Sequence, residues 1–145
     1  MSTDGAVPRP AQGGAYPYAG PIWIDYAPQA DGDPDPGEIV WAWVPYEEDT
    51  NVGKDRPLLV IGHGDTPGHF VALMLSTRDR AGERGWVSLG AGAWDHERRE
   101  SWVRTDRPLG IADGSVRREG AVLHSDRFLA VLDKARREQQ GENVD

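Results

Sequence analysis

The segment from Pro36 to Gly62 constrains the fold more than any other part of the chain. It contains two short apolar runs, residues 39–44 and 58–61, separated by a polar and highly charged loop. The first run is rich in β-branched and aromatic residues, and both runs are bounded by glycine or proline, as is typical of strands. Pro57 precedes the second run. Proline is tolerated at the first position of a strand, because no backbone N–H is needed there for pairing with a neighbouring strand. The pattern predicts two adjacent strands and places Arg56 where the loop meets the second strand.

Further short apolar runs predict more strands, and the end of the chain predicts one helix. The expected strands cover residues 38–44, 57–62, 69–76, 85–90, 102–107 and 109–112, with turn signals between them. After Ser125 and Asp126, apolar residues recur at helical spacing: Phe128, Leu129, Val131, Leu132 and Ala135. Several short strands and one packed helix predict a mainly β fold, a small and partly open barrel.

Length and composition exclude several classes of protein. A chain of 145 residues without internal repeats is enough for one domain with a sizeable core. It contains no cysteine, which excludes disulfide frameworks and thiolate metal sites and favours a reducing, cytoplasmic setting. No apolar run approaches the roughly 20 residues of a membrane span, and the first residues lack the pattern of a signal peptide. We therefore expect a cytoplasmic domain without membrane contact.

The net charge of −8 argues against a nucleic-acid partner, but the charge is unevenly distributed. Residues 1–36 carry five acids and one arginine, and residues 138–145 carry three acids and no base. The remaining segment, 37–137, holds 15 basic and 16 acidic residues. A domain so close to neutral can still gather arginines on one face.

Composition also divides the chain into an arm, a domain and a tail. Residues 1–36 are expected to form a flexible acidic N-terminal arm and linker, in which residues 1–20 are disordered. The alternation within residues 22–26 permits a short docked strand there. The compact domain is expected to span residues 37–139, and residues 140–145 form an acidic tail.

Four elements resemble, in the same order, the PemK/MazF family of toxin endoribonucleases, and more closely its PemK branch. They are Gly37–Val40 with the later Arg56-Pro57, the strand Leu73–Thr77, the strand Val103–Pro108, and the step Arg118–Leu123 before the helix. The resemblance covers residues 37–137. It implies an SH3-like barrel, paired as a homodimer, that acts as the toxin of a type II toxin–antitoxin system and is bound by a cognate antitoxin protein.

RNA carries its own nucleophile, the 2′-hydroxyl, so a carboxylate, arginines and a hydroxyl donor can cleave it without metal or cofactor. Arg104 and Asp106 are two residues apart on an expected strand and therefore face the same side. Arg56 and the Ser76-Thr77 pair stand at strand ends that could converge on that face.

The resemblance implies that Asp106 acts as the base, Arg104 as acid or phosphate clamp, and Ser76 as a contact to the scissile phosphate of single-stranded RNA. A guanidinium is a poor proton donor near neutral pH, so we expect Arg56 and Arg104 to stabilise charge instead. The expected catalytic residues are Arg56, Arg104, Asp106 and Ser76, and the expected substrate-binding residues are Thr77, Lys54, Arg78 and Arg107.

Two departures from the family pattern keep other functions open. The first loop, residues 47–55, has four acids and no histidine where the PemK branch has one, and we expect it to hold Arg56 by an ion pair. Leu109-Gly110 replaces the family's Arg-Thr and removes a cation.

One alternative is a catalytically weak or inactive barrel that binds a protein partner. A less favoured alternative is gyrase inhibition, which in a toxin family sharing this barrel rests on aromatic and glycine residues at the C-terminal end; residues 141–145 contain no aromatic.

Other constellations are weaker. His63 and His69, with Asp65 between them, imitate a metal site, but the intervening residues are ordinary hairpin residues, so no metal is expected. The tryptophans Trp86, Trp94 and Trp102 are expected to be core or dimer contacts rather than platforms for RNA bases.

Overall fold

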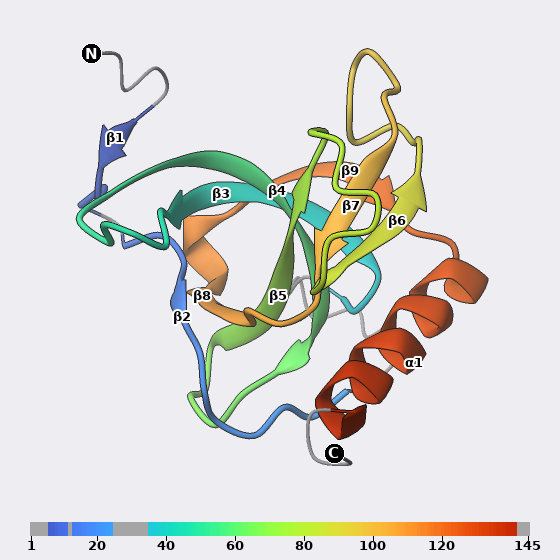
Figure 1. The fold of residues 1–145 in the computed structure, drawn as a ribbon. Helices are drawn as coiled ribbons and strands as arrows, with labels where there is room; N and C mark the ends of the chain where they lie inside the picture. The colour runs from blue at the N-terminus through green and yellow to red at the C-terminus, as the bar shows by residue number, and fades with distance from the viewer. Residues whose placement is uncertain (1–5, 12, 25–34, 142–145) are drawn as a thin grey trace.

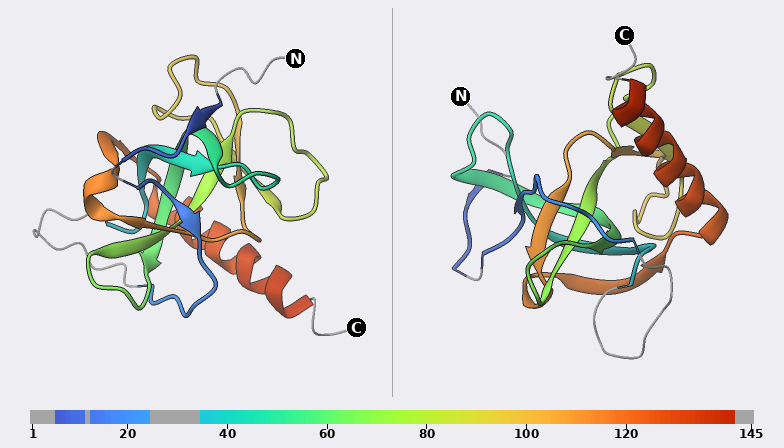
Figure 2. Two further views of the ribbon diagram at one scale, coloured as in Figure 1. Left: turned by 90° about the vertical axis from the view of Figure 1, so that its left-hand side faces the viewer. Right: turned by 90° about the horizontal axis from the view of Figure 1, so that it is seen from below.

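The computed structural model describes residues 6–11, 13–24 and 35–141. Antiparallel strands are the main regular structure of this part of the chain, and the helix α1 (Ser125–Gly141) lies along one side of them (Figures 1 and 2). The strands in chain order are β1 (Val7–Pro8), β2 (Tyr16–Pro17), β3 (Glu38–Pro45), β4 (Val52–His63), β5 (His69–Ser76), β6 (Trp86–Gly90), β7 (Ser101–Arg104), β8 (Leu109–Ala112) and β9 (Arg117–Val122). The expected mainly β fold with a C-terminal helix is confirmed.

Strand β5 is the centre of the sheet (Figure 1). One of its edges pairs with β4, from Leu58↔Met74 to His63↔Phe70. Its other edge pairs first with β8 and then, at Leu75 and Ser76, with β7. The rest of the sheet extends from these neighbours: β3 and β9 lie beyond β4, β2 lies beyond β8, and β6 lies beyond β7.

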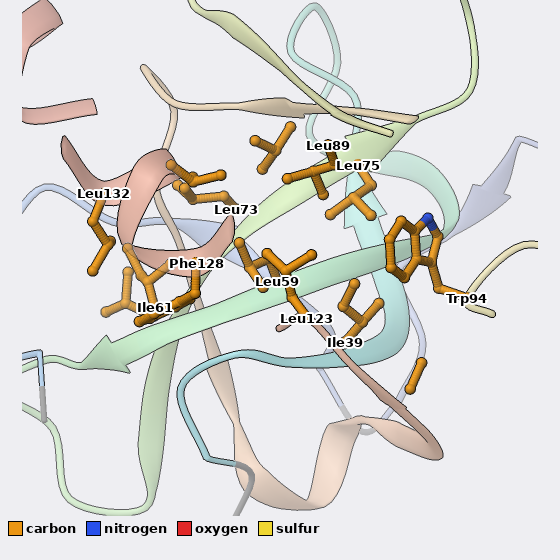
Figure 3. Packing of buried hydrophobic residues seen from close by; sticks show 14 residues of the cluster. Ile39, Leu59, Ile61, Leu73, Leu75, Leu89, Trp94, Leu123, Phe128 and Leu132 are labelled. Carbon is orange, nitrogen blue, oxygen red and sulfur yellow. The ribbon is translucent and has the colours of Figure 1, made fainter. Parts of the chain in front are cut away.

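The central strands are buried on both faces, which explains their continuous apolar runs. Successive residues of β4 alternate between two core clusters: Leu59 and Ile61 belong to the cluster beneath α1, and Leu58 and Val60 belong to the cluster on the opposite face. The helix inserts Phe128, which is fully buried, into the first cluster (Figure 3). The helix and one face of the sheet therefore share the first core cluster. The ends of the strands lie outside this packing, and their side chains are available for a site.

Two strand boundaries differ from the sequence prediction. Strand β4 begins at Val52 rather than near residue 57, because it pairs with β3 from Gly53 onward. Since β5 pairs with β4 only from Leu58, β4 is an edge on one side at Pro57, where a strand tolerates proline. Strand β7 ends at Arg104, three residues before the expected end, so Asp106 lies in a bend rather than on the strand.

The described part of the N-terminal arm pairs with the domain in three places. Its strand β1 pairs with Gly53 and Val52 of β4, β2 pairs with β8, and Trp23 forms a bridge to His63. Ala15 is fully buried in the second core cluster. A small residue, Ala15, therefore anchors the arm in the core. In the sequence, the scarcity of large apolar residues gave no sign of this contact. The expected docked strand at residues 22–26 lies partly outside the described residues.

Candidate functional site

A pocket of about 310 Å³ lies where β4 and β5 meet the loop that follows β5. We call it the cationic pocket, because five basic residues line it: Lys54, Arg56, Arg78, Arg80 and Arg99. Ser76 and Thr77 add hydroxyl groups, and Trp41 and Trp94 add apolar wall. The two acids of the lining are each ion-paired with an arginine, Asp55 with Arg117 and Asp95 with Arg99. The pocket is therefore suited to an anion.

Arg56 is the most informative residue of the cationic pocket. It is partly buried, and its guanidinium forms no hydrogen bond or ion pair with any residue that the structure describes. Burial lowers the pKa of its guanidinium, with a further contribution from the charges of Arg80 and Arg107. An arginine nevertheless stays protonated, so its donors remain available. The expected ion pair between the first loop and Arg56 is thus not formed in the described structure.

Four other candidate residues lie beside Arg56 in the cationic pocket. Lys54 lies two residues earlier on β4, and the charge of Arg56, more than burial, lowers the pKa of its ammonium group. Ser76 ends β5 and is buried, and its Oγ accepts a hydrogen bond from the backbone N of Arg78 at 3.2 Å. Thr77 follows directly. Four of the expected site residues therefore gather around Arg56 in one pocket.

A second group lies at the end of β7 and consists of one arginine between two carboxylates. Arg104 donates from Nε to Oδ1 of Asp106 at 2.7 Å. Its Nη1 and Nη2 donate to Oε1 and Oε2 of Glu47 at 2.8 and 3.1 Å. The hydrogen bond with Glu47 is the largest cause of the raised pKa of Arg104, and the same bond lowers the pKa of Glu47. Arg104 and Asp106, which were expected to face the same side, are hydrogen-bonded to each other, and Glu47 is an addition that the sequence did not reveal.

Gly85 determines where the Asp106 carboxylate can lie. Thr105 is buried, and its backbone N and side-chain Oγ1 both donate to the carbonyl of Gly85, at 2.8 and 3.2 Å. This bend brings Asp106 against the glycine, where a Cβ would come within 2.4 Å of Oδ2. Gly85 also has a φ of +84°, which favours glycine. The missing side chain at residue 85 thus creates the space that Asp106 fills.

The cationic pocket and the cluster of Arg104 with its two carboxylates lie next to each other but do not form one pocket. Arg104 and Asp106 do not line the cationic pocket. Arg80 connects them: it lines the pocket, and its guanidinium lies 4.4 Å from the ring centre of Trp86, which also has Arg104 at 5.9 Å. Arg107 donates to the carbonyl of Pro45 at 3.2 Å and is close enough to lower the pKa of Arg56. Burial in turn lowers the pKa of Arg107.

Three site residues were missed by the sequence reasoning. Arg80 lies beside Trp86, and its buried Nε has no hydrogen-bond partner among the described residues. Arg99 reaches the cationic pocket from the loop before β7, held there by Asp95. Glu47 crosses from the loop after β3 to Arg104. The signal for Arg80 was its position two residues after Arg78, whereas the other two contacts join distant segments and leave no local pattern.

The two histidines singled out as an imitation of a metal site have other partners. His63 stacks on Trp23, with ring centres 6.0 Å apart, and Nδ1 of His69 is 2.7 Å from the Tyr16 hydroxyl. Within residues 6–11, 13–24 and 35–141, no three or more histidine, aspartate or glutamate side chains come together as a metal site. Neither α1 nor the short 3-10 helix Asp113–Ser115, the helices in the described part of the chain, is long and apolar enough to cross a membrane.

The fold and the site first define a class: a mainly β domain whose strand ends carry a cationic pocket beside an arginine–carboxylate cluster. Residues 35–138 match the family model described as PemK-like, MazF-like toxin of type II toxin–antitoxin system. The chain therefore belongs to this family, as the four sequence elements predicted. The match does not distinguish the PemK branch within the family. No curated protein matches the chain.

Proposed function

We propose that the chain is the toxin of a type II toxin–antitoxin pair and a metal-independent endoribonuclease that cleaves single-stranded mRNA. The observation that carries this proposal is Arg56, a partly buried guanidinium without an ion pair among the described residues, which shares one pocket with Ser76 and three further arginines. A desolvated cation with unused donors favours a phosphate oxygen over water. Family membership supports the same reading.

In the proposed reaction the 2′-hydroxyl attacks the adjacent phosphorus and the 5′-oxygen leaves, which gives a 2′,3′-cyclic phosphate. Asp106 accepts the proton of the 2′-hydroxyl, and Arg104 orients that carboxylate through the bond from its Nε. Solvent water supplies the proton that the departing 5′-oxygen takes up. Arg56 stabilises the charge that develops on the phosphate, and the hydroxyl of Ser76 donates to it.

The remaining cations of the site serve binding rather than chemistry. Lys54, Arg78 and Arg107 hold the phosphates that flank the scissile one, and Thr77 adds a hydroxyl contact. We further propose the assembly that the family implies: a closed SH3-like barrel, a homodimer that binds RNA between its subunits, an antitoxin partner and a cytoplasmic setting.

The test is cleavage of mixed-sequence single-stranded RNA in excess EDTA. Wild type should yield fragments with 2′,3′-cyclic phosphate ends. Arg56→Ala, Arg104→Ala and Asp106→Asn should each lower the rate by at least about 100-fold, the effect of removing one charge-stabilising or proton-transferring group. The control is Arg137→Ala, since Arg137 pairs only with Asp133 on the exposed face of α1. Intact RNA at high micromolar concentrations of a wild-type chain that circular dichroism shows to be folded would overturn the proposal.

The second candidate is the catalytically weak or inactive barrel that binds a protein partner. One observation favours it: both terminal nitrogens of Arg104 are already occupied by Glu47. The folded but inert wild-type chain described above is the result that this candidate predicts.

A further inference from the structure

Glu47 occupies Arg104 in the way that a phosphate would. Both carboxylate oxygens accept from the two terminal guanidinium nitrogens, at 2.8 and 3.1 Å. The planar fork of an arginine binds carboxylates and phosphates in this same two-point geometry. The Nε of Arg104 donates to Asp106. A phosphate can therefore bind Nη1 and Nη2 in this two-point geometry only after Glu47 has left.

The loop that carries Glu47 is short and internally bonded. It consists of residues 46–51, between β3 and β4, and we call it the Glu47 loop. The backbone N of Tyr46 donates to the carbonyl of Val52 at 2.9 Å, and the N of Asn51 donates to Oδ1 of Asp49 at 3.1 Å. The Glu47 side chain is nevertheless 59% exposed. It can turn away from Arg104 into water without uncovering apolar surface.

The N-terminal arm holds the Glu47 loop from the other side. Strand β1 pairs with Val52 and Gly53, the first two residues after the loop. Arg9 donates to the carbonyl of Thr50 within the loop at 3.4 Å, and its guanidinium lies 4.6 Å from the ring centre of Trp43. Trp43 in turn donates to the carbonyl of Val7 at 2.9 Å. The arm thus fixes the loop at two points.

This arm is not part of the family domain. The family match begins at residue 35, whereas the contacts to the Glu47 loop come from residues 7–9. A segment outside the family domain therefore supports the loop that occupies a cation of the proposed site.

We propose that the Glu47–Arg104 pair is an autoinhibitory contact, held in place by the N-terminal arm, which an RNA phosphate must displace to bind. The proposal rests on the proposed function, since it concerns regulation of that same site. Its occupant is an RNA phosphate, because the vacated fork presents two donors beside Asp106, the proposed base. Removing the Glu47 charge should therefore tighten binding of a phosphodiester backbone.

The experiment measures binding of a fluorescent 2′-deoxy oligonucleotide to the full chain at fixed salt. This probe keeps the phosphates but lacks the nucleophile, so binding is separated from cleavage. Glu47→Gln should lower Kd about three- to fivefold, since an exposed ion pair is held only weakly. The matched control is Glu48→Gln, which removes the same charge from the same loop at a residue not bonded to Arg104. Because the charge of Glu48 also acts on Arg56 and Arg107, this variant should lower Kd by less than Glu47→Gln does rather than leave it unchanged. In an Arg104→Ala background, Glu47→Gln should no longer tighten binding.

The contribution of the arm is tested by Arg9→Ala. This change removes the bond to Thr50 and should lower Kd by less than Glu47→Gln does. In the Glu47→Gln background it should have no further effect, because the contact that the arm supports is already lost. An equal gain from Arg9→Ala in both backgrounds would show that the arm acts independently of Glu47 and would overturn its proposed role.

The outcomes separate this inference from the proposed function. Unchanged binding by Glu47→Gln, or an equal gain from Glu48→Gln, overturns the autoinhibitory contact whatever the chain does to RNA. Tighter binding by Glu47→Gln alone, with RNA left intact by both wild type and variant, supports the contact and overturns the endoribonuclease. Tighter binding together with faster cleavage at subsaturating RNA supports both.

Discussion

At the scale of single residues, the position of Asp106 depends on the absence of a side chain at residue 85. Gly85→Ala and Gly82→Ala should each lower the free energy of unfolding by about 1 kcal/mol, because alanine is strained at positive φ. The two glycines have φ values of +84° and +80°. Only at Gly85 would the new Cβ displace the Asp106 carboxylate from its place beside Arg104, so only Gly85→Ala should slow cleavage strongly. Urea denaturation and the cleavage rate measure the two effects.

Gly82 is a matched control, because a Cβ there has no heavy atom within 4 Å. Equal cleavage by the two variants would contradict the role given to Gly85.

The Asp95–Arg99 pair predicts a pH dependence of stability. The hydrogen bond from Arg99 is the largest cause that lowers the pKa of Asp95 to about 2 from its ordinary value of 3.8. A carboxyl with a lowered pKa in the folded state stabilises the fold above its unfolded pKa, and this contribution is lost as pH falls through the folded value. Asp95→Asn should therefore destabilise the chain at pH 7, and the difference from wild type should shrink between about pH 4 and pH 2.

Urea denaturation across that pH range measures the difference. A gap between wild type and Asp95→Asn that is the same at pH 7 and pH 2.5 would refute the assignment. Asp133→Asn, which breaks the exposed pair with Arg137 on α1, is a control for a surface ion pair.

At the scale of elements, α1 is held by its buried stripe. Phe128 is fully buried in the first core cluster, and its neighbour Leu129 is 57% exposed. Phe128→Ala should lower the free energy of unfolding by about 3–5 kcal/mol, because it leaves a cavity beneath the helix. Leu129→Ala should change it by no more than about 0.5 kcal/mol. Denaturant midpoints of the two variants check this, and similar losses at both positions would contradict the packing of α1.

The strands could be predicted where their apolar residues form continuous runs. Strand β5 was predicted with its observed ends, because both of its faces are buried and its ends are marked by turns. Strands β1, β2 and β9 were missed. Strands β1 and β2 are two residues long and form only by pairing with strands that are distant in the sequence. Strand β9 is rich in charged residues. Local patterns cannot reveal pairings of this kind.

The same distinction separates the two halves of the site. Ser76 lies on a predicted strand and Arg56 directly before the predicted start of another, and the β4–β5 pairing brings them together. Arg104 and Asp106 were expected to face the same side of one strand, whereas Asp106 lies in the bend after β7 and accepts a hydrogen bond from Arg104 there. Glu47 was not predicted at Arg104, because the two are 57 residues apart and charge alone does not select among several arginines.

At the scale of the whole molecule, the net charge of −8 does not describe the surface that the proposed RNA would meet. The cationic pocket has five basic residues and two acids, and each of those acids is paired with an arginine. The acidic surplus lies largely in residues 1–36 and 138–145. A locally positive site on an acidic protein favours ligands that reach the pocket itself over nonspecific binding along the surface.

The homodimer is the prediction that belongs to the whole molecule. Light scattering of the purified chain should give about twice the chain mass of 15.9 kDa. The two large apolar side chains most exposed in the described structure, Val122 at 65% and Leu129 at 57%, would then be candidates for cover by the second subunit. Trp94 and Trp102, in contrast, are buried within the chain itself. A monomer mass at high micromolar concentration would contradict the dimer.

The shared position of β5 has a consequence for how the site moves. Because β5 is paired along both edges, its amide hydrogens should exchange with solvent only when the whole domain unfolds. Ser76, at the end of that strand, pairs along one edge only, with Trp102 of β7, and is held by this slowly exchanging strand. Glu47 lies instead on a short surface loop whose amides can open locally. The proposed site thus has one side held by the sheet and one side on a loop that rearranges quickly. Opening of the loop would set the rate of substrate entry, and the sheet would preserve the geometry of the reacting groups.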